Sequence, residues 1–269
     1  MRSTVSEREQ EAAATESIIY EQPLTERVRT FLRLKFLLSQ TEQYARSESA
    51  WDSRTAIAAL LDIADMLTRG NARGEALKEL DSQIGVLALL RDNPDVDNPR
   101  LLGVLRQLER LKAELSDRKG PAGQRLRDNE FLSAIKHRSA IPGGTCEFDL
   151  PGYHFWLSQP TERRATDIDA WLKELAPLHE AISVLLDLNR QSADAVPQVA
   201  EDGVFQYDMR NQSNCQLIRV LLPAASKVFP EISGGRHRVT IRFFDRPDIN
   251  ARPRQVDYDV DFDLMLCHL

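Results

Sequence analysis

The stretch SAIPGGTCEFDLPGYHFWL, residues 139–157, interrupts a chain whose flanking segments have helical periodicity. Apolar and polar residues alternate through TCEFDL and again, after Pro151-Gly152, through YHFWL. A period of two is typical of a β-strand. We therefore predict that residues 139–158 leave the helical part of the chain and join a sheet formed elsewhere.

The segments on either side of this stretch carry apolar residues at helical spacing. Asn98-Pro99, a typical helix start, precedes a stripe formed by Leu101, Leu105, Leu108, Leu111 and Leu115. Such a stripe is usually the core of a helical bundle and sometimes the seam of a dimer. We predict a discontinuous helical domain over residues 18–138 and 159–196.

The C-terminal part of the chain has short segments of period two, separated by Gly, Pro and Asn. The alternation is clearest in RHRVTIRFF (236–244) and VDYDVDFDL (256–264). A loop-like segment joins these runs, so an antiparallel hairpin is the economical interpretation. The predicted fold class is α+β: an N-terminal, mostly helical bundle domain and a C-terminal antiparallel β-domain (139–158 and 200–269) that takes in the central strand segment.

The composition excludes several classes of protein. The net charge of −6 and the pI near 5.5 argue against a general nucleic-acid binder. No apolar run approaches the roughly 20 residues that a membrane span requires. The polar residues 1–17 have no apolar core of a secretory signal, and we expect a flexible tail. The three cysteines lack CxxC spacing, so we expect neither a disulfide framework nor a metal or cofactor, and a cytoplasmic location.

Two candidate sites need to be compared with simpler interpretations. Cys146 and His154 could form a thiol-dependent hydrolase, but no nucleophile signature surrounds the cysteine, and a free cysteine between Phe and Leu is usually a core residue. The alternating aspartates of 257–263 lie about 6.8 Å apart on one strand face, too far for easy chelation of one ion. Pairing with the arginine face of the neighbouring strand is the better explanation.

Arginines gather at helix ends, at segment junctions and on one strand face: Arg69, Arg73, Arg138, Arg190, Arg236, Arg238 and Arg242. Most surface arginines are solvated or paired with acids, but clustered ones can bind the carboxylates of an acidic peptide. An RNA-binding role for the arginine-rich strand face is disfavoured by the acidic net charge and the nearby aspartates. The residues alone therefore indicate an interaction protein without a visible active site.

Several blocks of the sequence together resemble one family. They are YEQPLTERVRTFLRLKFLL (20–38), RGEALKELD (73–81), the stretch at 139–157, LLDLNRQSA (185–193) and PEISGGRHRVTIRFF (230–244). In this order they are similar to the ZapD family of cell-division proteins, which associate with FtsZ. The tail before residue 18 and the loop near 245–255 depart from the family.

The resemblance implies a non-enzymatic protein with a helical domain and a β-domain that works as a homodimer. Members bind the C-terminal tail of FtsZ, cross-link or bundle its filaments, and support Z-ring assembly at midcell. The resemblance also implies tail-binding residues: Arg33, Arg69, His154, Arg238 and Arg242. From the clustered arginines we add Arg73 and Arg236 to the expected site. Glu130 stands at a position that is basic in some relatives, which argues against a contact from its helix.

Overall fold

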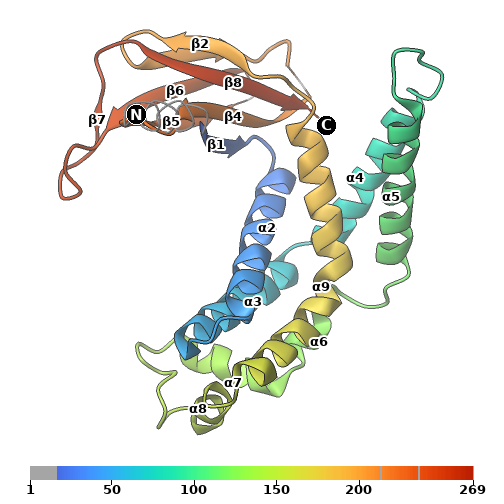
Figure 1. Ribbon diagram of the computed structural model, residues 1–269, viewed down its shortest axis with the longest axis vertical. Helices are drawn as coiled ribbons and strands as arrows, with labels where there is room; N and C mark the ends of the chain where they lie inside the picture. Colours follow the sequence, from blue (N-terminus) through green and yellow to red (C-terminus); the bar gives the residue numbers. More distant parts are fainter. Residues whose placement is uncertain (1–16, 213, 236, 269) are drawn as a thin grey trace, which may run out of the picture. The chain divides into compact units, whose positions relative to one another are not determined.

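The computed structural model describes residues 17–212, 214–235 and 237–268. These residues form a first strand, then a series of helices and then antiparallel strands (Figure 1), so the predicted α+β class is confirmed. The predicted polar tail lies outside the described residues, except for Ser17, which begins a strand.

The chain divides into two compact units. The first, here called the β unit, combines the N-terminal segment up to Arg29 with Asp187–Leu269, and the second, the helical unit, is Thr30–Leu186. The boundary after Arg29 falls in the first turn of the helix at residues 26–45, and the boundary before Asp187 falls in the last turn of the helix at residues 161–190. Each of these two helices therefore belongs to both units. Residues 139–158, which we expected in the β-domain, belong to the helical unit.

Several of the described helices begin where the sequence supplies an N-capping side chain. In chain order the helices are α2 (Glu26–Ala45), α3 (Ala50–Arg69), α4 (Ala72–Ala88), α5 (Asn98–Ser116), α6 (Gln124–Arg127), α7 (Glu130–Ser139), α8 (Pro151–Leu157) and α9 (Thr161–Arg190). Ser49, Asn71, Asp97 and Asn129 each accept a hydrogen bond from a backbone N–H of the first turn. These bonds satisfy donors that a helix leaves without an internal partner.

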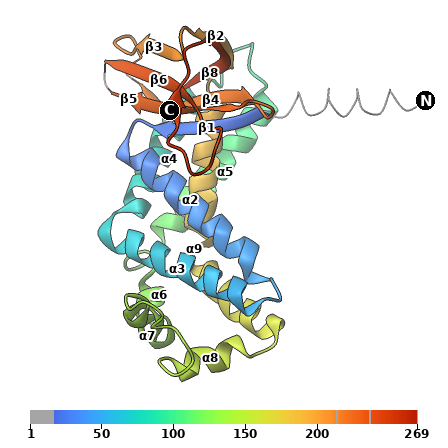
Figure 2. The ribbon, with the colours of Figure 1, turned by 90° about the vertical axis from the view of Figure 1, so that its left-hand side faces the viewer.

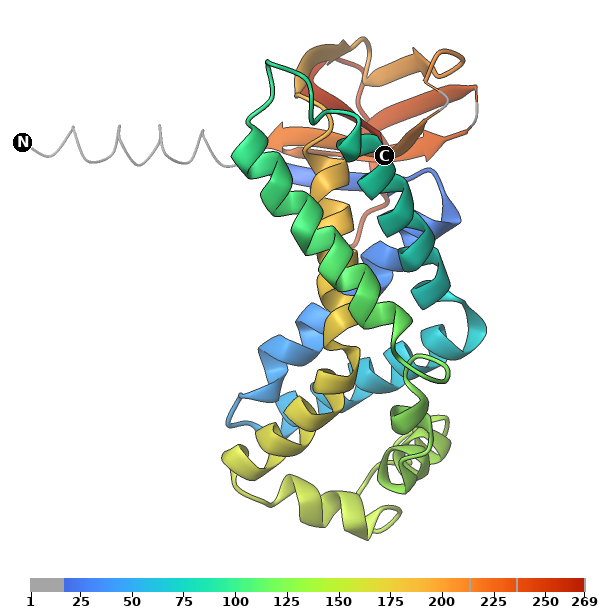
Figure 3. The ribbon, with the colours of Figure 1, turned by 90° about the vertical axis from the view of Figure 1, so that its right-hand side faces the viewer.

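The leucine stripe of α5 belongs to the core of the helical unit. All five of its leucines are buried, and Leu108 and Leu111 are fully inaccessible. The helix packs against α4, as the two neighbouring green and teal helices in Figure 3 show. Of the two interpretations of this stripe, the bundle core is therefore the correct one.

The strand prediction for the central stretch is wrong. Residues 140–149 form successive turns, and α8 starts with Pro151 in its first turn (Figure 2). Tyr153, Trp156 and Leu157 are buried at the three- and four-residue spacing of a helix, and the Trp156 ring lies 5.6 Å from that of Phe131. The alternation of apolar and polar residues in this short segment does not decide its structure. Only a helix buries Tyr153, Trp156 and Leu157 on one face.

The strands form two antiparallel sheets. The strands are β1 (Ser17–Pro23), β2 (Val196–Ala200), β3 (Val204–Asp208), β4 (Cys215–Pro223), β5 (Val228–Gly234), β6 (Arg238–Asp245), β7 (Arg254–Gln255) and β8 (Val260–His268). One sheet has the order β1-β4-β8-β2 and the other β3-β6-β5, with β7 on β6. Their inner faces share one core, in which the Phe243 and Phe262 rings lie 5.1 Å apart.

The predicted hairpin between the two clearest strands does not form. The alternation itself is confirmed, since Val239, Ile241 and Phe243 are buried on β6 and Phe262 and Leu264 on β8. However, β6 pairs with β3, β5 and β7, whereas β8 pairs with β2 and β4. Both strands point their apolar face into one core, so their charged faces lie on opposite outer surfaces. The predicted pairing of arginines with aspartates is therefore wrong.

Strand β1 was not predicted, and a cluster of charges holds it in place. Glu21 of β1 accepts hydrogen bonds from Arg190 Nε and Nη2, both at 2.8 Å, and from Arg219 Nε at 3.1 Å. The bonds to Glu21 raise the pKa of Arg190. We call Glu21, Arg190 and Arg219 the Glu21 cluster; it ties the N-terminal strand to the end of α9 and to β4.

Candidate functional site

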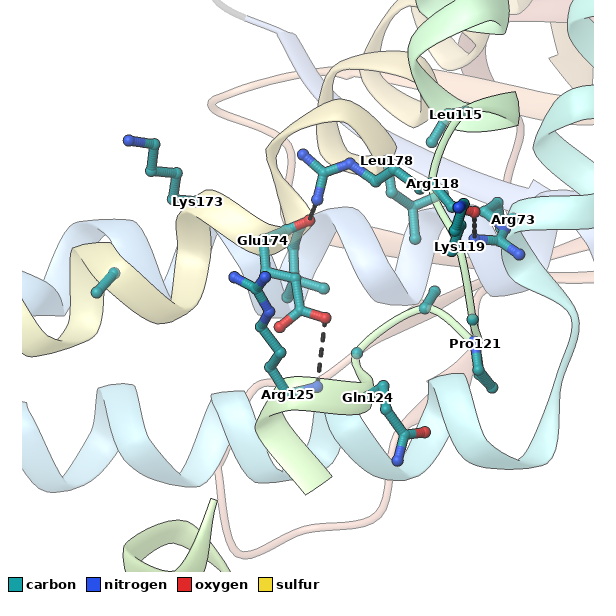
Figure 4. Close-up of a pocket in the computed structure, with 15 residues that line it drawn as sticks. Arg73, Leu115, Arg118, Lys119, Pro121, Gln124, Arg125, Lys173, Glu174 and Leu178 are labelled. Carbon is teal, nitrogen blue, oxygen red and sulfur yellow. Dashed lines mark hydrogen bonds between the residues drawn. The ribbon is translucent and has the colours of Figure 1, made fainter. Parts of the chain in front are cut away.

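A hollow of about 620 Å³ lies within the helical unit, at the junction of α5, α6 and α9 (Figure 4). Its apolar floor is formed by Leu115, Leu175 and Leu178. Its charged lining consists of Arg73, Arg118, Lys119, Arg125, Lys173 and Glu174. We call this hollow the basic pocket, because five basic side chains face one acidic side chain.

The connection between α5 and α6 shapes the pocket. Gly120 and Gly123 have φ angles of +77° and +70°, a conformation that other L-residues rarely adopt. A Cβ at Gly123 would also lie 2.9 Å from a methyl group of Leu67. The two glycines let the chain turn tightly, which brings Arg118, Lys119 and Arg125 to the same hollow.

Backbone carbonyls hold two of the arginines in position. Arg73 Nη1 donates to the carbonyl oxygen of Arg118 at 2.9 Å, and Arg118 Nη1 donates to that of Glu174 at 2.8 Å. Figure 4 shows Arg118 and Arg125 on either side of Glu174, while Lys173 extends away from them. The Glu174 carboxylate accepts a bond from the backbone N–H of Arg125 at 3.4 Å. A carbonyl orients a guanidinium without neutralising it, so the positive charge remains available to an anion.

Basic side chains of the pocket make no ion pair with any carboxylate of the described residues. The protein as a whole has a net charge of −6. A local excess of positive charge in an acidic protein focuses the potential at the pocket. The arrangement can bind an extended anion, above all one that carries carboxylates.

The predicted site residues of the helical unit lie in different places. Arg73 lines the basic pocket. Arg33 on α2 and Arg69 at the end of α3 are exposed and are not part of its lining. His154 is exposed on α8, with Nε2 3.9 Å from a carboxylate oxygen of Glu147. Of these four residues, the structure therefore brings only Arg73 to the pocket.

The predicted site residues of the β unit lie on β6. Arg238 and Arg242 are exposed on its outward face. Arg238 Nη1 donates to Gln206 Oε1 at 3.3 Å, and Arg242 stands opposite Glu231 in the strand register. Arg236 lies outside the described residues.

Most of the pocket's basic residues were not predicted as site residues. Arg118, Lys119 and Arg125 belong to the segment DRKGPAGQRLR (117–127). The signal that could have identified them is a run of basic residues, interrupted by Gly and Pro, between two helices. Lys173 gives no comparable signal, because an exposed lysine on a long helix is ordinary.

The geometry of Cys146 does not suit a thiol-dependent hydrolase. Its Sγ donates to a carboxylate oxygen of Asp149 at 3.4 Å, whereas an activated thiolate needs a positive or basic neighbour. His154 is not among the polar partners of Cys146 in the described part of the chain. Cys215 and Cys267 are buried strand residues, and desolvation raises the pKa of each to about 11. Both therefore remain protonated near neutral pH.

Among the residues that the structure describes, the His, Cys, Asp and Glu side chains form no group of three or more that could hold a metal ion. None of the described helices combines the length and the hydropathy that crossing a bilayer requires.

Comparison with known proteins identifies the family. The profile of the ZapD family, described as a cell division protein, matches residues 32–242. The chain is 40% identical over 252 residues to the cell division protein ZapD of Methylococcus capsulatus, covering 94% of this chain and 98% of that protein. It is 36% identical over 252 residues to the cell division protein ZapD of an Azoarcus species, covering 94% of this chain and 100% of that protein. The chain belongs to the ZapD family of cell-division proteins.

Proposed function

We propose that this protein is a non-enzymatic cell-division factor that binds the C-terminal tail of FtsZ through the basic pocket. The observation that carries the proposal is the pocket itself, where five basic side chains face one acid in a protein of net charge −6. An acidic peptide is the partner that such a charge distribution attracts. Nucleic acid is a poorer partner, because the rest of the molecule repels it.

The chemistry of the pocket suits a short extended peptide. Arg73 and Arg118 are oriented by backbone carbonyls, so little side-chain entropy is lost when their remaining N–H groups bind carboxylates. Leu115, Leu175 and Leu178 offer an apolar surface to a side chain of the peptide. A single tail held mainly by exposed ionic contacts binds weakly, and its affinity falls as salt rises.

Arg238 and Arg242 are a second candidate contact for the tail. They lie on the same face of β6 with Thr240 between them, so their side chains lie about 13 Å apart. The described aspartates of β8 belong to the other sheet and do not compete for them. In the strand register Arg238 lies opposite Asp208, which pairs with Arg210, and Arg242 lies opposite Glu231. Neither arginine forms an ion pair with a carboxylate of the described residues, so both can bind acidic groups of a partner.

Cross-linking of FtsZ filaments requires more than one tail site in each assembly of this protein. Two copies of the protein that associate carry two tail sites, and an FtsZ filament displays many tails. Each second binding event is then intramolecular, and effective concentration converts weak contacts into stable bridges. In this proposal the protein acts in the cytoplasm and is recruited to the division site at midcell.

A charge-reversal experiment tests the pocket. Lys119 and Arg125 are exposed, and neither side chain bonds another described residue, so Lys119→Glu/Arg125→Glu should preserve the fold. We expect at least about a tenfold increase in the Kd of a fluorescent FtsZ tail peptide, measured by anisotropy at low salt. Arg91→Glu is the matched control, because Arg91 is exposed in the same unit but outside the pocket. Wild-type affinity in the folded double variant would remove the pocket from the site.

A further inference from the structure

Glu174 is the single acidic side chain among the described residues that line the basic pocket. It is half-buried on α9, and Figure 4 shows its side chain between Arg118 and Arg125. An anionic ligand that reaches these two guanidinium groups therefore enters the space beside the Glu174 carboxylate. The pocket attracts an anion and contains a negative charge of its own at the same place.

Two hydrogen bonds fix Glu174 in this position. Its backbone carbonyl accepts a bond from Arg118 Nη1 at 2.8 Å, and its Oε1 accepts a bond from the backbone N–H of Arg125 at 3.4 Å. The carboxylate makes no ion pair with a basic side chain of the described residues. Its charge is therefore not confined to one partner, and it acts through space on all the basic side chains around it.

The charge of Glu174 has opposite effects on the two states of the pocket. In the empty pocket it offsets the mutual repulsion of five basic side chains. In the occupied pocket it repels each carboxylate of the ligand, because like charges that are brought together cost free energy. A group that stabilises the empty state and destabilises the occupied state lowers the affinity of the site by the difference between the two effects.

We infer that Glu174 is an internal competitor, a fixed carboxylate that weakens the binding of anionic peptides to the basic pocket. The inference rests on the proposed function and deepens it, because it names a residue that sets the affinity of the same site. A weak single contact suits a protein that binds many tails at once. Effective concentration then supplies the overall stability, and each contact can still dissociate rapidly.

A different role for Glu174 would be to pair with a basic side chain of the ligand. The lining of the pocket disfavours this role, because a cation that reaches Glu174 must approach five basic side chains. The two roles predict opposite results when the charge of Glu174 is removed. A competitor gives tighter binding of an anion, and a ligand-pairing residue gives weaker binding of a ligand that carries a base.

The test is Glu174→Gln, which keeps the shape of the side chain and its acceptor for the Arg125 N–H but removes the charge. The probe is a fluorescent, N-acetylated hexaglutamate peptide, which carries no basic group and does not depend on FtsZ. Anisotropy at low salt should show a Kd about threefold to tenfold below that of wild type. The gain should shrink near 1 M salt, where charges are screened within about 3 Å.

The matched control is Glu109→Gln. Glu109 is an exposed acid of the same unit, on α5, and does not line the pocket, so this variant loses the same charge elsewhere and should keep the wild-type Kd within about twofold. Urea unfolding supplies a second measurement. Glu174→Gln should unfold at a lower urea concentration than Glu109→Gln, because five basic side chains lose their counter-charge. Tighter binding together with lower stability is a result that a purely structural role of Glu174 does not give.

The remaining outcomes overturn the inference. An unchanged Kd in the Glu174→Gln variant means that its charge does not act on the ligand, and a higher Kd means that the carboxylate organises the pocket for binding. Failure of hexaglutamate to bind both proteins means that the pocket does not attract anions. The FtsZ tail peptide is then measured with the same two proteins. If hexaglutamate binds the variant more tightly but the tail binds neither protein, the proposed function fails while the role of Glu174 stands.

Discussion

In the β unit, Arg190 and Arg219 converge on the carboxylate of Glu21, whereas in the helical unit Arg73 and Arg118 donate to backbone carbonyls. The first pair of arginines is matched by two acids, because Asp187 Oδ1 also lies 3.3 Å from Arg190 Nη1, and their side chains are only 25% and 14% exposed. The second pair keeps its charge at the edge of a hollow. Arginines of the first kind serve the fold, and arginines of the second kind are available to a partner. The difference lies in what each guanidinium touches.

The largest effect that separates these two kinds of arginine is expected from Glu21→Gln. The substitution leaves the largely buried Arg219 without a counter-charge and Arg190 with Asp187 alone, so we expect the free energy of unfolding to fall by about 3 kcal/mol. Urea unfolding followed by circular dichroism measures the change. The control Glu201→Gln removes an exposed acid of the same unit and should change stability by less than about 0.5 kcal/mol. Equal stability of the two variants would show that the Glu21 cluster does not hold β1.

In the basic pocket, the substitution to compare with Glu21→Gln is Arg118→Ala. The side chain is exposed and makes one hydrogen bond, to the carbonyl of Glu174, so the stability loss should stay near about 0.5–1 kcal/mol. Tail-peptide affinity should fall about tenfold, as for an arginine at the centre of an interface. Arg118→Lys keeps the charge but loses the planar fork and should lie between wild type and alanine. A large stability loss with unchanged affinity would place Arg118 with the structural arginines.

A smaller effect is expected on β6. Arg238→Ala/Arg242→Ala removes two exposed side chains, of which only Arg238 bonds a described residue, Gln206. We expect stability to change by less than about 0.5 kcal/mol and peptide affinity to fall severalfold. The loss should shrink as salt rises, because exposed charges are screened within about 8 Å at physiological ionic strength. A double variant that binds like wild type at low salt would exclude β6 from the tail site.

The smallest effect is expected at Cys146. Its thiol donates to Asp149, and no basic group of the described residues bonds it and would activate it. Cys146→Ser keeps a donor at this position, so both stability and peptide affinity should remain those of wild type. A folded variant with lost affinity would mean that the turns before α8 take part in binding.

The sequence predicted those parts of the fold that depend on local pattern. The leucine stripe of α5 and the inward alternation of β6 and β8 follow from side-chain periodicity, and both are confirmed. The sequence could not predict that β6 and β8 belong to different sheets, because two strands with the same inward pattern fit equally into one sheet or into two facing sheets. The central stretch was misassigned because four to six alternating residues do not outweigh the burial of Tyr153, Trp156 and Leu157 on one helical face.

The site was predictable only in part. Sequence and family resemblance pointed to arginines, and Arg73 does line the basic pocket. Arg118, Lys119 and Arg125 reach the same hollow because of the turn at Gly120 and Gly123, and Lys173 comes from a helix far along the chain. Whether an arginine is neutralised depends on partners that can be distant in sequence, such as Glu21 for Arg219. No local pattern contains that information.

The most direct test of the central claim, that the unneutralised charges of the basic pocket bind FtsZ, is co-sedimentation with polymerised FtsZ. Wild-type protein and the Arg91→Glu control should pellet with the polymers, and wild type should also raise their light scattering. The Lys119→Glu/Arg125→Glu variant should remain in the supernatant at the same concentration and salt. Equal pelleting of this folded variant and the wild type would contradict the account.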